Sequence, residues 1–201
     1  MGGKSPQASR LGSDNSAQII ASPKKNITQE LVKQGIIYLR EGDYESAQKV
    51  FSASVKVSPN SSTLHLLNGI SYHLQFLSNS AESKELAETA YSLASTLDKS
   101  DPLPLIQLGR LHIGSGEYSQ ASKDFISAHA LSPSNEDALF GLLQSSIHQN
   151  DFNTALWAGE SLKKINTTDA EKLRLMALMY AAVGKTSEAT QSFASYEKIN
   201  S

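Results

Sequence analysis

The chain contains no cysteine among its 201 residues, which excludes disulfide bonds, thiol nucleophiles and thiolate metal sites. It also lacks long hydrophobic runs. The longest nearly apolar stretch, Leu175–Val183, has nine residues, whereas a membrane-spanning helix needs about 20. We therefore expect no transmembrane segment.

Motifs for catalysis and cofactor binding are missing as well. Gly184-Lys185-Thr186 resembles the end of a nucleotide-binding P-loop, but the first glycine of that motif would fall at position 179, which is Met179. There is no G-x-S-x-G or H-E-x-x-H sequence, and the histidines are scattered. We expect no enzyme activity, no cofactor and no metal ion. The five histidines are His65, His73, His112, His129 and His148.

Positive charge is scarce outside the N-terminal region. Residues 1–27 carry four basic side chains and one acidic one, a net charge of +3, which leaves −5 for residues 28–201 out of the total of −2. An acidic region without a basic stripe is a poor binder of nucleic acid. We expect no nucleic-acid partner.

Residues 1–27 are rich in Ser, Gly, Asn and Gln and show no apolar periodicity, so we predict a disordered leader. The leader also lacks the apolar core of a signal peptide. A polar leader of this kind is typical of the segment after the lipidated cysteine in bacterial outer-membrane lipoproteins. One interpretation is therefore a lost lipid anchor and a location at the periplasmic face of the outer membrane. The alternatives are a native cytoplasmic start or a fragment of a longer protein.

A short pattern that begins with Gly or Asn and ends with Ala occurs four times. Its last three alanines are spaced 34 residues apart, and the first lies 74 residues before the second, which leaves room for two units and six extra residues. A period near 34 is typical of helix–turn–helix arrays. The four copies are GDYESA at 42–47, GEYSQA at 116–121, NDFNTA at 150–155 and GKTSEA at 184–189.

Each copy has a mechanical interpretation. Gly or Asn supplies the left-handed residue that ends a first helix. The alanine lets a second helix approach closely, and an aromatic residue one turn later closes the pair at Phe51, Phe125 and Phe193. Three first helices carry a small residue followed three positions later by tyrosine, and in a fourth His112 follows Gly109. The three pairs are Gly35 and Tyr38, Gly69 and Tyr72, and Ala177 and Tyr180.

These residues resemble the tetratricopeptide-repeat family, whose pattern of Leu-Gly, Tyr, Ala, Phe and Pro is matched closely at 28–61 and 102–135. The resemblance implies an all-α, right-handed α-solenoid of about five helix–turn–helix repeats. Repeat four departs from the pattern, with Leu143 at the small position and Gly159 at the aromatic one. The predicted repeats span about 28–61, 62–101, 102–135, 136–169 and 170–201.

In this family the first helices line a concave groove, so the resemblance implies a non-enzymatic scaffold or adaptor that binds a protein or peptide. The predicted lining is mostly aliphatic, which favours an apolar or amphipathic segment. Arg110 is expected to meet a carboxylate or carbonyl groups of that ligand. Similar small repeat lipoproteins and chaperones assist bacterial secretion and pilus assembly. The predicted groove residues are Val32, Ile36, Leu66, Ile70, His73, Ile106, Arg110, Phe140, Gln144 and Arg174.

An alternative function is a self-associating structural module that stacks through its C-terminal repeat. The final helix carries Phe193, Tyr196 and Ile199 where a following repeat would pack, and terminal repeats need polar caps. Trp157 occupies a position that is polar in the other regular repeats, which is typical of a contact residue. The alternative is that Trp157 folds toward the space left by Gly159. We expect homodimerisation or docking through these four residues.

Overall fold

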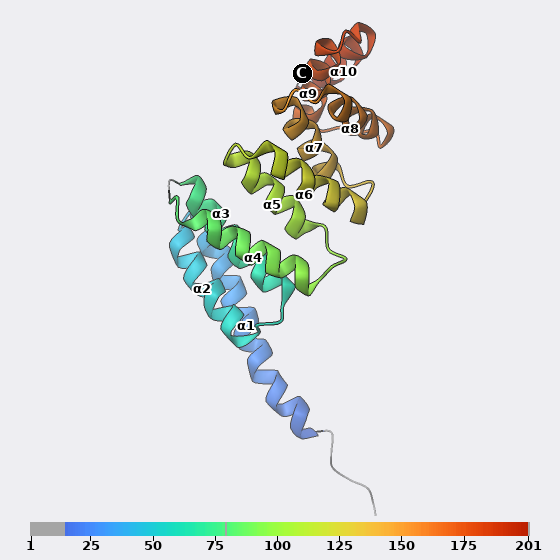
Figure 1. Cartoon of the computed structure of the whole chain (residues 1–201). Coiled ribbons are helices and arrows are strands. Elements are labelled where there is room, and N and C mark those ends of the chain that lie inside the picture. Colours follow the sequence, from blue (N-terminus) through green and yellow to red (C-terminus); the bar gives the residue numbers. More distant parts are fainter. Residues whose placement is uncertain (1–14, 79, 201) are drawn as a thin grey trace, which may run out of the picture.

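A computed structural model describes residues 15–78 and 80–200, and it consists of helices joined by short turns (Figure 1). None of these described residues lies in a β-strand. The structure confirms the predicted all-α fold. Its helices are α1 (Asn15–Glu41), α2 (Tyr44–Val57), α3 (Ser62–Leu77), α4 (Ser83–Leu97), α5 (Leu103–Gly114), α6 (Tyr118–Leu131), α7 (Glu136–His148), α8 (Phe152–Lys164), α9 (Ala170–Ala182) and α10 (Thr186–Asn200).

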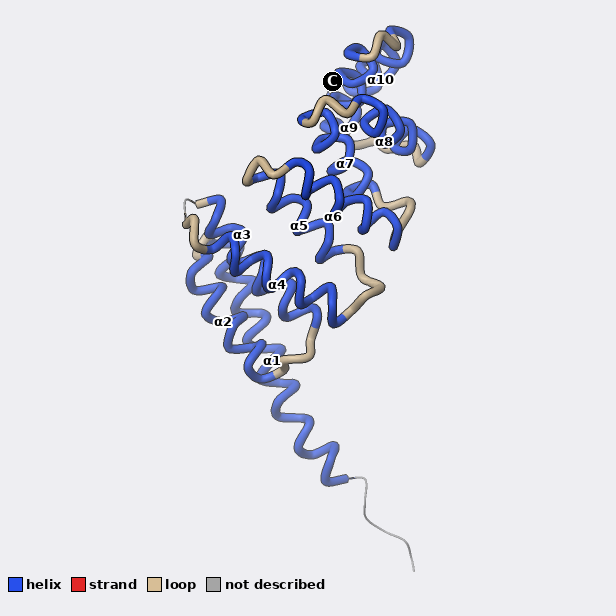
Figure 2. Tube along the Cα trace, in the orientation of Figure 1, coloured by secondary structure: helices blue, strands red, loops and turns tan. Residues whose placement is uncertain are grey.

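The helices form a row of antiparallel pairs, each stacked on the next (Figure 2). Within a repeat, the first helix packs on the second, as α1 does on α2 and α3 on α4. Each second helix then packs on the first helix of the following repeat, and α3, α5, α7 and α9 also contact one another in succession. Because the first helices contact one another in this way, they lie along the inner side of the array.

In each of the first three helix pairs, an aromatic ring of the second helix packs on a glycine of the first. A Cβ added to Gly35 would lie 2.5 Å from the ring of Phe51, and one added to Gly109 would lie 2.6 Å from the ring of Phe125. Tyr91 covers Gly69 in the same way. All three rings are completely buried. The predicted pairing of a small residue with an aromatic one therefore describes the core of these repeats.

The turns inside the repeats end their helices with left-handed residues, as the sequence predicts. Gly42, Gly116 and Gly184 have φ values of 77°, 77° and 76°, and Asn150 takes the same role with a φ of 57°. The following residue can then cap the second helix, as Asp43 does by accepting a hydrogen bond from the Ser46 N–H at 3.0 Å. The hexapeptide repeat is thus a helix stop followed by a helix start.

The predicted leader differs from the structure. Helix α1 begins at Asn15, so the prediction of disorder is wrong for residues 15–27, while residues 1–14 lie outside the described residues. The physical reason is that extending an existing helix costs far less than nucleating one. The part of α1 that packs on α2 supplies the nucleus, so a polar sequence without apolar periodicity can continue the helix outward (Figure 1).

Candidate interaction surfaces

The predicted groove residues fall into three groups of exposure. Most of them are half-buried along the inner side of the first helices, and the two arginines are exposed. The remaining pair is buried. The half-buried residues are Val32, Ile36, Leu66, Ile70, Phe140 and Gln144; the exposed ones are Arg110 and Arg174; the buried ones are His73 and Ile106.

Ile106 and His73 are not available to a ligand. Ile106 is completely buried in the core cluster around Phe125, so its predicted place as a groove anchor is corrected to a core residue. His73 lies against Tyr91, with its Nδ1 3.3 Å from the tyrosine hydroxyl. The reason is that consecutive first helices touch, so part of each inner face is used for packing between repeats.

A pocket of about 290 Å³ lies on the inner side between repeats three, four and five. Phe140 and Gln144 of α7 line it together with Arg110 of α5, and Lys172 of α9 closes one end. The pocket thus brings together three of the predicted groove residues. The Arg110 guanidinium lies 3.2 Å from the Asp137 carboxylate, so its partner within the chain is one that the sequence analysis did not foresee.

Lys172 joins repeat four to repeat five at the edge of this pocket. Its ammonium lies 3.0 Å from Glu136, 3.6 Å from Asp137 and 3.8 Å from Asp169. Burial by itself would lower the pKa of Lys172, but the ion pairs, led by that with Glu136, outweigh burial and raise it. The pocket therefore surrounds the apolar side chain of Phe140 with charged side chains. This arrangement suits an amphipathic segment better than a purely apolar one.

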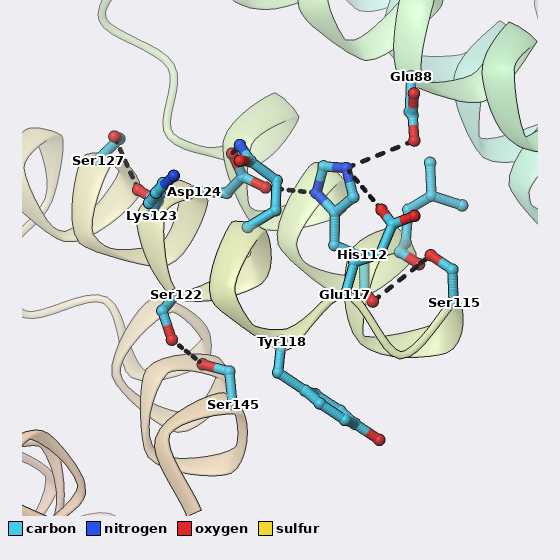
Figure 3. Close-up of polar contacts among 12 residues, drawn as sticks. Glu88, His112, Ser115, Glu117, Tyr118, Ser122, Lys123, Asp124, Ser127 and Ser145 are labelled. Atoms are coloured by element: carbon cyan, nitrogen blue, oxygen red, sulfur yellow. Dashed lines mark hydrogen bonds and ion pairs between the residues drawn. The ribbon is translucent and has the colours of Figure 1, made fainter. Parts of the chain in front are cut away.

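A second polar cluster joins repeat two to repeat three (Figure 3). The imidazole of His112, on α5, is only 7% exposed, and its Nδ1 lies 2.6 Å from the Asp124 carboxylate. Its Nε2 points between Glu88 of α4, at 3.4 Å, and Glu117, at 3.7 Å. The hydrogen bond to Asp124, followed by the nearby carboxylates, raises the pKa of His112 above its usual value.

Sequence analysis did not assemble this cluster, although one signal was present. His112 stands where the other regular first helices carry tyrosine, so a titratable ring replaces a packing ring. Its partners come from α4, α6 and the turn before α6. Only the packing of two repeats brings these residues together, and no short motif records it.

The C-terminal repeat exposes the apolar residues that the sequence singled out. Phe193 is 47% exposed and Ile199 48%, and the Phe193 and Tyr196 rings lie 5.8 Å apart. Trp157 is 48% exposed and meets the His129 ring edge-on at 5.1 Å. The space beside Gly159 is instead occupied by Met179 of α9, whose methyl group would lie 2.5 Å from an added Cβ.

The helices in the described part of the chain include none that combines the length and the apolar character needed to cross a membrane.

Comparisons with known proteins agree on the architecture. The tetratricopeptide-repeat family model matches residues 31–61. A cytochrome c-type biogenesis protein, CcmH, of Escherichia coli is 26% identical over 153 residues, which is 75% of this chain and 41% of that protein. The chain therefore spans about two fifths of the length of the curated relatives that it matches.

Solved structures with the same fold cover most of the chain. A structure titled for Pseudomonas aeruginosa pilF has a TM-score of 0.74 at 18% identity, covering 88% of this chain and 78% of that one. A MamA crystal structure has a TM-score of 0.68 at 20% identity, covering 87% and 92%. The fold is that of a helical-repeat protein. More narrowly, the chain resembles the tetratricopeptide-repeat family, whose model matches residues 31–61.

Proposed function

We propose that the protein is a non-catalytic scaffold that binds an amphipathic or largely apolar peptide segment along the inner side of α5, α7 and α9. The observation that carries the proposal is the pocket of about 290 Å³ in which the half-buried Phe140 lies among Arg110, Gln144 and Lys172. An apolar side chain of the segment would pack on Phe140, where water is most fully excluded. Gln144 and Arg110 would donate hydrogen bonds to its backbone carbonyl groups.

The ion pair between Arg110 and Asp137 shapes this recognition. Both side chains are 45% exposed, so the pair holds the arginine in place but is weak enough to be rearranged by a ligand. A ligand carboxylate would have to compete with Asp137, whereas a neutral carbonyl can share the guanidinium. The pocket therefore favours a segment whose contact residues are neutral.

The cellular role that we propose is assembly of a bacterial secretion or pilus machine. The fold likeness to the structure titled for pilF supports a pilus-related role. The partial relative named for cytochrome c-type biogenesis supports assembly work more generally. In this role the inner side of the array would hold one component of the machine while it is being placed.

The test begins by placing a photo-crosslinking amino acid at Gln144 in cells of the source organism and identifying the captured protein. Its binding segment is then titrated with purified variants. Phe140→Ala is expected to weaken binding by roughly 1–3 kcal/mol, the range for a hot-spot anchor. Arg110→Glu is expected to weaken it further, because a carboxylate would repel the backbone carbonyls.

The matched control is Phe152→Ala on α8, an exposed phenylalanine outside the pocket. It should leave binding unchanged. Thermal melts of the same variants separate the two roles of Phe140. Normal melting with normal binding in Phe140→Ala would refute this site, and early melting would make Phe140 a core residue.

Self-association through the C-terminal repeat is the second candidate function. It is favoured by the exposure of Phe193 and Ile199 on α10, because the residues equivalent to Phe193 in the other repeats are all buried. A second copy of the chain that covers this face would give a homodimer.

A further inference from the structure

We propose that His112, Glu88 and Glu117 form a zinc-binding site that fastens repeat two to repeat three. One imidazole nitrogen and two carboxylate oxygens come together here, and their ligand atoms all lie within 4.8 Å of one another. Zinc is bound by imidazole nitrogens and carboxylate oxygens, and zinc sites with three protein ligands leave a fourth position for water. Glu88 lies on α4, whereas His112 and Glu117 belong to repeat three.

The geometry of His112 is the observation that points to a ligand. Its side chain is more than nine-tenths buried, and Asp124 accepts a hydrogen bond from Nδ1 at 2.6 Å. In the neutral imidazole this bond leaves the lone pair on Nε2. Nε2 is then aimed between the two glutamates (Figure 3). A carboxylate behind a histidine in this way is the usual support of a zinc-ligating imidazole.

The distances suit a zinc ion after a small adjustment. Ligands about 2.1 Å from a tetrahedral ion lie about 3.4 Å from one another. Nε2 is already 3.4 Å from Glu88 and 3.7 Å from Glu117. The carboxylates are 31% and 46% exposed in their side chains, so they have room to turn. A shift of about 1 Å in one glutamate closes the site around an ion.

The charge of the cluster favours a divalent cation. Glu88, Glu117 and Asp124 contribute three negative charges, and Lys84 contributes one positive charge, so a neutral His112 leaves a net charge of −2. A zinc ion cancels this charge while Lys84 stays in the cluster and leaves a net charge of −1 when Lys84 turns into solvent.

Lys84 is the competitor that occupies the carboxylates in the absence of metal. Its ammonium lies 2.9 Å from Glu88 and 2.8 Å from Glu117. Its stem is flexible and 21% exposed, so the ammonium can swing into solvent when zinc binds. The lysine thus lowers zinc affinity. Removing it should therefore strengthen zinc binding, a result that is not expected if the cluster only holds the two repeats together.

The experiment is isothermal titration of the full chain, without a histidine tag, with zinc chloride near neutral pH. We expect one zinc ion per chain. Glu117→Gln should weaken zinc binding roughly tenfold or more. Asp124→Asn should weaken it roughly 10–100-fold, because the imidazole of His112 loses the carboxylate that orients it. Lys84→Met should strengthen binding. His112→Tyr, the residue that other repeats carry at this position, should abolish it.

The control is His148→Gln, an exposed histidine outside the cluster, which should bind zinc as the unaltered chain does. Magnesium should not replace zinc, because imidazole is a poor ligand for it. Circular dichroism melts identify any variant that fails to fold, and Glu117→Gln, at an exposed position, keeps the test decisive if His112→Tyr unfolds. Absence of zinc binding by both the unaltered chain and Lys84→Met, or unchanged binding by the His112 and Glu117 variants, overturns the proposal.

Discussion

The ring of Phe125 shows how single atoms decide packing in this array. It lies against the bare backbone of Gly109 in its own repeat and against Gly141 of the next. A methyl group at either glycine would overlap the ring, and the ring is completely buried, so it has little room to move. The two glycines therefore act as sockets for one aromatic residue that joins two repeats.

Gly109→Ala is predicted to lower the free energy of unfolding by roughly 1–3 kcal/mol, the usual cost of overpacking a core. Urea denaturation measures it. The matched control is Gly114→Ala at the end of the same helix, where the nearest side-chain atom would be 3.6 Å away. That change should be neutral or stabilising, because alanine favours helix. Equal losses of stability at Gly109 and Gly114 would contradict the proposed close packing of Phe125 on Gly109.

His73 and His112 make the folding stability depend on pH in opposite directions. Burial, followed by the nearby charge of Arg110, lowers the pKa of His73 from 6.5 to about 4. Between these values the unfolded chain binds more protons than the folded one, so His73 makes stability rise with pH. The raised pKa of His112 makes its contribution complete below pH 6.5 and lost as pH rises through the folded value.

His73→Leu is predicted to flatten the rise of stability between pH 4 and 6.5. Leucine stands at the equivalent position, Leu39, in repeat one, so the change keeps the packing type. The measurement is the slope of the unfolding free energy against pH, compared with His148→Gln, an exposed histidine. An unchanged slope in His73→Leu would show that His73 is protonated as easily in the folded chain as in the unfolded one.

At the scale of helices, the turns illustrate which features the sequence can predict. Each helix stop depends on one residue with a positive φ, so Gly42 and Asn150 are recognisable by type and spacing. The start of α1 at Asn15 depends instead on continuation from a packed segment. Ile106 looked like a groove residue because helical periodicity gives its face but not how deeply neighbouring first helices cover that face.

Gly116→Ala is predicted to lower the free energy of unfolding by about 1–2 kcal/mol. The position has a φ of 77° and open space around it, so the cost is backbone strain alone. Gly116→Asn should cost less, because Asn150 adopts this conformation at the equivalent turn. Denaturant midpoints of the two variants give the comparison, and a smaller loss for alanine than for asparagine would refute the argument.

At the scale of the whole molecule, the array has unequal ends. Phe193 occupies the position of Phe51, Tyr91 and Phe125, which are completely buried, yet it is half exposed on α10. The first helix presents a more polar outer side, with Lys33 beside Glu30. The half-exposed Phe193 ring on α10, against paired charges on α1, is the reason why the proposed self-association is placed at α10.

Phe193→Ser is predicted to abolish concentration-dependent association of the chain in sedimentation experiments while leaving its melting temperature nearly unchanged. The loss follows because about half of a buried ring's contact area would go to the second copy. The control is Ile126→Ser, an exposed apolar residue on α6, which should associate as the unaltered chain does. A strictly monomeric unaltered chain at high concentration would end this proposal.

The succession of contacts from one repeat to the next also determines how the protein responds to force. The junctions between repeats are elastic elements in series, and a pull on the two ends is divided among them as small rotations. Their compliances add, so the array stretches further than a compact domain before any helix is lost. The pocket of about 290 Å³ spans two of these junctions, so the same rotations would also change its shape.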